Sequence, residues 1–179
     1  STLFPYTTLF RSAYEMTSVS GLFTLEIPGF CFVIDDGATA EELAAYGLDE
    51  ENAQMFLDDV RARSKGQDVI YRADFSAVLT VTVDPGAGMT EAAMLANEDG
   101  LNIDEALTGE DYSYEGVVMV EDNPNAFYLV RVDHGGYEEL GFTTAHDATG
   151  ASITFSFAGF SDAEARDILK TLVMLDVYD

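Results

Sequence analysis

Short runs of alternating apolar and polar residues, broken by turn residues, fill the first part of the chain. Gly21 to Ile27 alternates, and after Pro28-Gly29 an apolar run from Phe30 to Ile34 ends at Asp35-Asp36-Gly37. Pro-Gly is a turn signal, so this stretch predicts two short strands or one strand with a kink.

Two helices are predicted next. Thr39 stands three residues before Glu42, which fits a capping box, and Gly47 fits a stop at the C-terminal end. Asp49 then begins a second helix that runs to about Arg63, with acids first and bases last, the order that the helix dipole favours. Its apolar stripe comprises Ala53, Phe56, Leu57 and Val60.

The middle of the chain predicts two strands and a short helix. Asp68 to Ala73 and Ala77 to Val83 have strand character. A short helix begins at Thr90. The polar connection that follows, Asn97 to Glu110, holds one further turn around Ile103 to Leu107.

The last third predicts an antiparallel meander that ends in a helix. Connectors rich in Gly, Asn and Asp, which suit hairpin turns, separate its strand-like runs. The runs are Tyr112 to Glu121, Ala126 to Asp133, Tyr137 to His146 and Ala151 to Ala158. Ser161 and Glu164 fit a capping box for the final helix. Its apolar stripe is Ala165, Ile168, Leu169, Leu172 and Val173.

Together these elements predict an α+β fold: an antiparallel sheet of six to eight strands with covering helices, the last of them packed on the sheet. The 179 residues suit one domain, and 47% of them are hydrophobic, which is enough for a core. No apolar run reaches about 18 residues, the length of a membrane-spanning helix, so the residues present predict no membrane insertion.

The chain is strongly acidic: 33 Asp and Glu stand against 8 Lys and Arg, for a formal charge of −25. Nucleic acids and anionic lipid surfaces attract clustered Lys and Arg, so neither is expected as a partner. Acidity of this kind serves solubility, and recruitment of cations or of a basic partner is the alternative left open.

The first residues stand apart from the rest of the chain. Thr2 to Ser12 reads TLFPYTTLFRS, which matches a translation of a common short-read sequencing adapter. We therefore expect residues 1–12 to be an artefact of a metagenomic fragment and residues 13–179 to be a single α+β domain. On this expectation the native N-terminus is missing, together with any signal peptide, lipid-attachment cysteine or membrane anchor that it carried.

A resemblance to a known group of proteins rests on the order of elements. The residues that carry it are Phe23 to Ile27, Pro28-Gly29, Phe30 to Ile34, Ala44 to Asn52, Gly141 to Thr144, the Gly150 hairpin, Ile153 to Phe157 and the closing amphipathic helix. In this order the chain resembles the PsbP-like α/β/α sandwich, above all in uncharacterised proteins of Gram-positive gut bacteria. Such proteins are often exported or membrane-tethered, and members with known roles are binding or accessory proteins. The resemblance covers nearly the whole chain after Ala13, and it supplies no functional motif.

Few residues are candidates for reactive chemistry. Cys31 lies in the apolar run Phe30 to Ile34, so we expect a core residue rather than a nucleophile. His134 falls in a hairpin connector and His146 at a strand end. We expect both histidines to be exposed and about 25–35 Å apart, too far to share a metal ion.

Calcium binding is considered because Ca²⁺ prefers oxygen ligands and carboxylates recur at turns. Asn97-Glu98-Asp99-Gly100 is similar to an EF-hand loop, but that register places Leu95 and Ala106 at ligand positions, which excludes the motif. A weak divalent-ion site remains open at the carboxylate pairs. These are Asp35-Asp36, Asp49-Glu50-Glu51, Glu121-Asp122-Asn123 and Glu138-Glu139.

No catalytic set is found in the sequence. There is no Gly-x-Ser-x-Gly elbow, Gly86-Ala87-Gly88 lacks the other residues of a phosphate loop, and no tryptophan offers a sugar platform. Arg72 and Arg131 are expected to pair with surplus carboxylates. The meander contains five further candidates, all aromatic: Tyr112, Tyr114, Phe127, Tyr128 and Tyr137. Those on one face of the meander are expected in the core, and those on its other face are a candidate contact surface.

These observations predict a non-catalytic binding or accessory domain of a bacterial envelope or secreted protein, with a protein partner and no cofactor beyond the open case of Ca²⁺. No catalytic or cofactor-binding residue is assigned, and metal ligands stay unassigned. Two alternatives remain: a hydrolase with an acidic site that the sequence does not reveal, and a cytosolic protein-binding cofactor. A deep pocket with converging carboxylates of raised pKa would favour the enzyme, and a flat aromatic face would favour binding.

Overall fold

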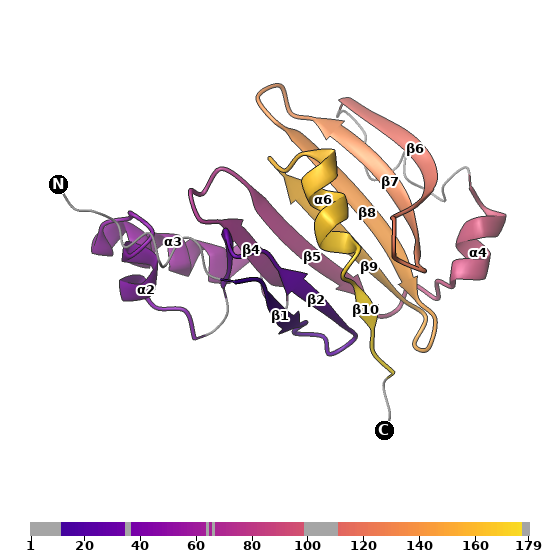
Figure 1. Ribbon diagram of the computed structural model, residues 1–179, viewed down its shortest axis with the longest axis horizontal. Helices are drawn as coiled ribbons and strands as arrows, with labels where there is room; N and C mark the ends of the chain where they lie inside the picture. The colour runs from indigo at the N-terminus through magenta and orange to yellow at the C-terminus, as the bar shows by residue number, and fades with distance from the viewer. Residues whose placement is uncertain (1–11, 35–36, 64, 66, 99–110, 177–179) are drawn as a thin grey trace.

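The structure, a computed structural model, describes residues 12–34, 37–63, 65, 67–98 and 111–176 (Figure 1). In spatial order the larger sheet comprises β3 (Cys31–Ile34), β4 (Asp68–Arg72), β5 (Val78–Asp84), β9 (Ala151–Ala158), β8 (Glu138–His146), β7 (Ala126–Asp133) and β6 (Asp111–Met119). The smaller sheet comprises β1 (Tyr14–Thr17), β2 (Phe23–Ile27) and β10 (Val173–Met174). The helices are α2 (Ala40–Ala44), α3 (Glu50–Arg63), α4 (Glu91–Ala96) and α6 (Asp162–Leu169).

The predicted α+β fold is confirmed. The larger sheet has seven strands, all paired antiparallel, and β6 to β9 form the expected meander. The capping boxes at Thr39 and Ser161 are both present, as their spacing to Glu42 and Glu164 predicts. In the described part of the chain, no helix is both long and apolar enough to span a membrane.

Alternation along the strands gives the larger sheet one strongly apolar face. On β9, Ile153, Phe155 and Phe157 are fully buried, and Leu79 and Val81 of β5 lie on the same side. The smaller sheet and α6 lie over this face (Figure 1) and share its core. The result is a sandwich of the larger sheet against a mixed layer of strands and helix.

Phenylalanine rings cross this core in edge-to-face contacts. The Phe142 ring on β8 lies 6.0 Å from that of Phe127 on β7 and 5.9 Å from that of Phe157 on β9. Phe23 of β2 lies 5.3 Å from Phe155, which joins the smaller sheet to the larger one. Such pairs stabilise by about 0.5–1.5 kcal/mol each beyond the burial of their area.

The opposite face of the larger sheet is covered at its two ends. Leu43 of α2 and Leu57 of α3 pack with Val69 of β4 at one end. Met94 of α4 packs with Tyr128 and Ala145 at the other.

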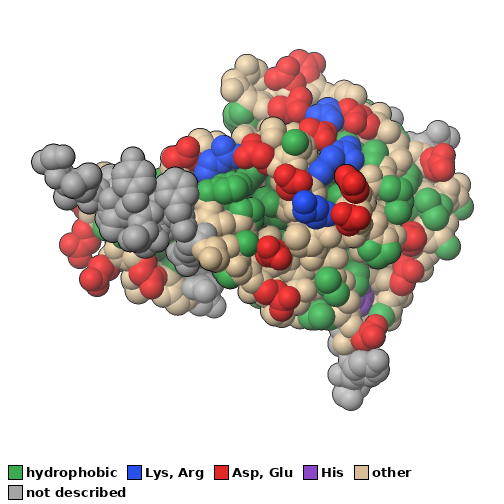
Figure 2. All heavy atoms as spheres, viewed as in Figure 1, with side chains coloured by type: hydrophobic (Ala, Val, Ile, Leu, Met, Phe, Trp, Pro, Cys, Tyr) green, Lys and Arg blue, Asp and Glu red, His purple; other side chains and the backbone are tan. Residues whose placement is uncertain are grey.

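Arginines hold the N-terminal end of α6 against the apolar face. Arg131 of β7 pairs with Asp162, the first residue of α6, and Arg166 pairs with the same carboxylate at 2.5 Å. Although burial alone would raise it, hydrogen bonds from both arginines hold the pKa of Asp162 below its ordinary value. Figure 2 shows basic side chains gathered over this region beside acidic ones. Arg131 also pairs with Glu115 and Glu138, so its expected role is confirmed.

The sequence pattern is wrong where the chain forms the smaller sheet. The final helix ends at Leu169, and Val173 begins β10 with 56% of its surface exposed rather than continuing the apolar stripe. β1 has no counterpart among the predicted strands. Pro28-Gly29 does separate two short strands, β2 and β3, as one of the two predicted arrangements has it, and the two strands belong to different sheets. The predicted turn around Ile103 to Leu107 and the adapter segment up to Arg11 lie outside the described residues.

Gly159 provides a first test of the fold, because it joins β9 to α6 with φ +81°. A Cβ at this position would lie 2.5 Å from the Ser76 carbonyl oxygen. We expect Gly159→Ala to lower the free energy of unfolding by about 3 kcal/mol or more, because strain and a backbone clash add. Gly135→Ala is the matched control, since Gly135 has φ +87° but open space around its Cβ position. Equal losses for the two variants in urea unfolding would contradict the packing described here.

Asp68 and Asp162 predict opposite dependences of stability on pH. Burial raises the pKa of Asp68, whose Oδ1 accepts a hydrogen bond from Val19 N at 3.0 Å. Its contribution is therefore fully present at low pH and is lost as pH rises through the folded-state pKa. For Asp162, with its lowered pKa, the contribution is present at neutral pH and is lost on acidification.

We therefore expect Asp68→Asn, which keeps an oxygen acceptor, to gain in stability relative to the unmodified chain as pH rises from about 4 to 7. For Asp162→Asn, the deficit in stability should stay nearly constant over that interval and shrink as pH falls below about 4, where the unmodified chain loses the contribution of Asp162. Urea unfolding at about pH 7, at about pH 4 and below about pH 4 measures the two differences. If both variants moved in the same direction, the assigned environment of at least one carboxyl group would be incorrect.

Candidate functional site

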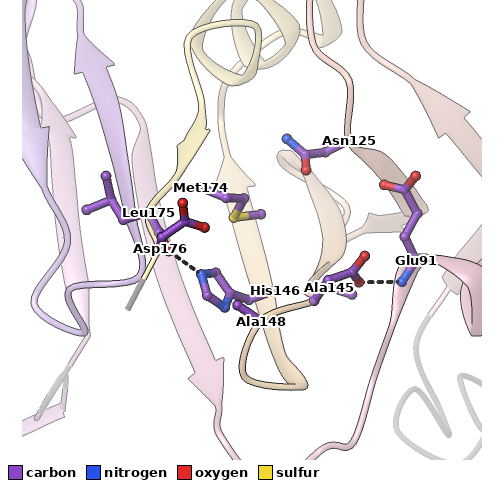
Figure 3. Close-up of a pocket in the computed structure, with 9 residues that line it drawn as sticks. Glu91, Asn125, Ala145, His146, Ala148, Met174, Leu175 and Asp176 are labelled. Carbon is purple, nitrogen blue, oxygen red and sulfur yellow. Dashed lines mark hydrogen bonds between the residues drawn. The ribbon is translucent and has the colours of Figure 1, made fainter. Parts of the chain in front are cut away.

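A pocket lies at the end of the larger sheet, where the β8–β9 turn, the start of α4, the start of β7 and the segment after β10 meet (Figure 3). Its volume is about 190 Å³. It is lined by Glu91, Asn125, Ala145, His146, Asp147, Ala148, Met174, Leu175 and Asp176.

His146 forms a buried wall of the pocket, with 1% of its surface exposed. Its Nε2 lies 2.8 Å from the Leu175 carbonyl oxygen, so Nε2 carries hydrogen and donates. Its Nδ1 lies 2.9 Å from Thr149 Oγ1, a hydroxyl that can donate to it. Both ring nitrogens therefore have partners, and the tautomer with hydrogen on Nε2 satisfies both contacts when the Thr149 hydroxyl donates to Nδ1.

The prediction that His146 is exposed is wrong. His146 is the last residue of β8 and lies four positions after Phe142. Because side chains alternate along a strand, the two side chains lie on the same apolar face. The segment after β10 then covers the ring and accepts its hydrogen bond at Leu175. The end of a strand is exposed only when no other segment packs over it, and such packing between segments remote in sequence is a tertiary feature.

Backbone N–H groups hold two carboxylates at the rim. Asp147 Oδ1 accepts a hydrogen bond from Glu91 N at 2.8 Å, which ties the β8–β9 turn to the start of α4. Glu91 Oε2 accepts one from Ala126 N at 3.2 Å. In Figure 3, Glu91 and Asn125 stand on one side of the cavity and His146 and Asp176 on the other, with Met174 between them.

Asn123 joins this wall of the pocket to the end of α6. Its buried amide Nδ2 donates to the carbonyl oxygens of Leu169 and Leu172, at 2.8 and 3.1 Å. Its Oδ1 accepts from Asn125 N at 2.9 Å. Sequence reasoning assigned this residue only to a turn and a carboxylate pair. The one available signal was a connector, Asp122 to Asn125, richer in Asn than a tight hairpin requires.

The lining gives the pocket a clear chemical character. It presents carboxylates of Glu91, Asp147 and Asp176, the amide of Asn125, and apolar surface from Met174 and Leu175. The nine lining residues, all described, include neither Lys nor Arg. Nor does any group of three or more His, Cys, Asp and Glu residues among the described positions have the placement to hold a metal ion. The polar part of the lining is therefore rich in hydrogen-bond acceptors.

The other sequence-predicted candidates lie elsewhere. Cys31 is a core residue as expected, and burial raises the pKa of its thiol to about 12. His134 is exposed as expected; its ring stacks on Tyr137 at 4.7 Å, and its Nε2 lies 2.8 Å from Glu139 Oε2. Arg72 pairs with Glu164 of α6, as expected.

The carboxylate pairs that fall on described residues form no group of three or more that could hold a metal ion. Asp49 accepts a hydrogen bond from Asn52 N at 2.8 Å and so caps α3. Glu138 pairs with Arg131 on the larger sheet. Asp35-Asp36 and the Asp99-Gly100 part of the EF-hand-like loop lie outside the described residues.

The tyrosines of the meander do not form a free contact face. Tyr128 is buried, and its hydroxyl lies 3.2 Å from Met94 O and 3.1 Å from Asn97 O, where it donates to the end of α4. Tyr114 stacks edge-on against it at 6.1 Å and donates to Glu98 O. Phe127 is in the main core, and Tyr137 is 53% exposed. These rings therefore position α4, and with it Glu91, at the pocket.

Comparisons with known proteins add little to this geometry. No family model matches the chain, and no curated protein matches it. Among solved structures it is similar to a protein of Bacteroides thetaiotaomicron VPI-5482, crystallised at 1.50 Å resolution, with a TM-score of 0.49 and 13% identity. The match covers 92% of this chain and 49% of that one, so this chain spans about half the length of the protein that it matches. A likeness at this level carries no argument about function.

Replacing His146 tests how the pocket is held together. His146→Ala removes the donor to Leu175 O and leaves a cavity, so we expect a loss of about 2–4 kcal/mol in unfolding free energy. Hydrogen exchange should become faster at the Leu175 amide, which donates to Leu22 O at 2.8 Å, while amides of β9 stay protected.

His134→Ala is the matched control, and it should leave exchange at Leu175 unchanged because His134 lies in the β7–β8 connector at the other end of β8. If exchange at Leu175 were unaltered in His146→Ala, the histidine would not anchor the segment after β10.

Proposed function

We propose that this chain is a non-catalytic binding domain, and that the pocket between α4, the β8–β9 turn and the segment after β10 is its binding site. The observation that carries the proposal is the state of the pocket's polar groups. Glu91 and Asp147 are oriented by backbone N–H groups, and His146 has both nitrogens engaged. Carboxylates oriented in this way can hold a ligand. His146 Nε2 is bound to a main-chain carbonyl oxygen, which takes no part in proton transfer.

Reactive groups outside the pocket give no support to the hydrolase alternative. The Cys31 thiol is buried with its pKa raised to about 12, so the thiolate that a nucleophile requires is scarce at neutral pH. Asp68 has a raised pKa, but it belongs to β4, bonds to Val19 N, and does not line the pocket. The raised pKa of Asp68 therefore belongs to a carboxyl group outside the pocket.

A protein is our proposed partner, in line with an accessory role. The resemblance to PsbP-like proteins supports that role and is the sole support for an envelope or secreted location. A cytosolic binding role would use the same pocket.

A fragment titration tests the proposal directly. Small soluble fragments of varied charge are added to the ¹⁵N-labelled chain, and amide shifts are followed by NMR. We expect saturable shifts at Asp147, Ala148 and Leu175, and we expect each fragment to be recovered unchanged after long incubation. Replacing Ala148, which is exposed at the pocket, by Trp should abolish those shifts by filling the mouth. Met55→Trp, at an exposed position on α3, is the control and should preserve them.

Two results would overturn the proposed function. One is hydrolysis of ester, glycoside or peptide fragments that is lost in Glu91→Gln or Asp147→Asn. The other is an absence of saturable shifts at the pocket for every fragment tested.

A further inference from the structure

The pocket's charge points to the class of group that it binds, an inference that rests on the proposed function. Its rim carries Glu91, Asp147 and Asp176, and its nine lining residues include neither Lys nor Arg. Elsewhere in the described chain, carboxylates of α6 are neutralised by arginines, as Asp162 is by Arg131 and Arg166. A cation that entered the pocket would therefore meet the carboxylates of Glu91 and Asp147 with no Lys or Arg in the lining.

The cavity has room for an occupant larger than a bare metal ion. A cavity needs about 10–15 Å³ to hold one water molecule, so about 190 Å³ accommodates a group of several non-hydrogen atoms. Among the described residues no three ligating side chains are close enough to share an ion. Figure 3 shows Glu91 and Asp176 on opposite sides of the cavity, so a group that enters it lies between them.

The remaining lining completes the description of the ligand. Met174 and Leu175 are half-buried and give the cavity an apolar side, against which methylene groups can pack. Asn125 Nδ2 donates to Asn123 Oδ1 at 2.7 Å, which fixes its amide at the pocket wall. A short aliphatic stem with a charged donor head matches this combination of apolar side and acidic rim.

We propose that the pocket binds the ammonium or guanidinium group of a Lys or Arg side chain presented by a partner protein. Asp147, Ala148 and Asp176 are exposed, so the rim is open to a side chain that arrives from another molecule. The formal charge of −25 favours encounter with a basic partner. Arg is held by paired carboxylate contacts and Lys by a compact charge, and both are rich in donors where the pocket is rich in acceptors.

The test uses four probes of matched size on the full chain: butylammonium, butylguanidinium, butanol and butyrate. By NMR, the two cations should shift the amides of Asp147, Ala148 and Leu175 saturably, and butanol and butyrate should not. Raising NaCl from about 0.05 to 0.5 M should weaken cation binding, because the rim is solvent-accessible. Glu91→Gln and Asp176→Asn should each weaken it about two- to five-fold. Glu51→Gln, at an exposed position on α3, is the matched control and should have no effect.

Further arms separate the sources of the cation. The blocked tripeptide acetyl-Gly-Lys-Gly-amide should bind at least as tightly as butylammonium and should also shift amides around the rim. If butylammonium binds and the tripeptide does not, the site takes a free amine, and the protein-partner assignment is overturned. If Ca²⁺ at millimolar concentration gives the same shifts as butylammonium, the pocket is an inorganic cation site, and the inference is again overturned.

Failure of this inference is distinguishable from failure of the proposed function. Equal binding of butanol and butylammonium at the pocket would overturn the cation assignment and leave a binding domain for neutral groups. Binding of butyrate alone would also overturn the cation assignment, and it would leave a binding domain for anions. No binding of any probe or fragment at the pocket would overturn both.

Discussion

The packing of phenylalanine rings on one face of the larger sheet is the interaction on which the rest of the structure depends. Four rings on this face are fully buried: Phe127, Phe142, Phe155 and Phe157. Burial of one such side chain is worth about 1.5–3 kcal/mol, so this face must be covered. The cover comes from both ends of the chain: β2 near its start and α6 near its end. The need to cover this face thus brings distant parts of the sequence together.

The pocket is a consequence of that cover. After α6 the chain pairs with β2 through β10 and passes over the end of β8, where Leu175 accepts the hydrogen bond from His146. Asn123 fixes the other wall to the same segment through the carbonyl oxygens of Leu169 and Leu172. The arginines act at the opposite end of α6, where Arg131 and Arg166 share Asp162. The chain has 8 Lys and Arg residues against 33 Asp and Glu residues. Two of these few basic residues pair at that end of α6, and the pocket lining contains neither Lys nor Arg.

Local sequence rules predict the elements well and their assembly less well. The meander follows from alternation and turn residues, and the starts of α2 and α6 follow from the spacing of Thr39 to Glu42 and Ser161 to Glu164. β10 is too short to have a periodic signal, and its pairing with β2 depends on contacts between distant parts of the chain. The same limit hides the site. The sequence predicts an exposed His146 because the segment that buries this residue is remote in sequence. It predicts only a turn residue at Asn123 because the carbonyl oxygens that accept from its amide are at the end of α6.

The central claim is that His146 is a structural wall of a binding pocket rather than an acid–base group. The most direct test is a long-range ¹H–¹⁵N correlation spectrum of the imidazole at neutral pH, which distinguishes the two neutral tautomers and the imidazolium. The account predicts one neutral form with hydrogen on Nε2, donated to Leu175 O, and no change when butylammonium is added. A ring protonated on both nitrogens, or on Nδ1 alone, would contradict the account, because the wall would then be built on a different hydrogen bond.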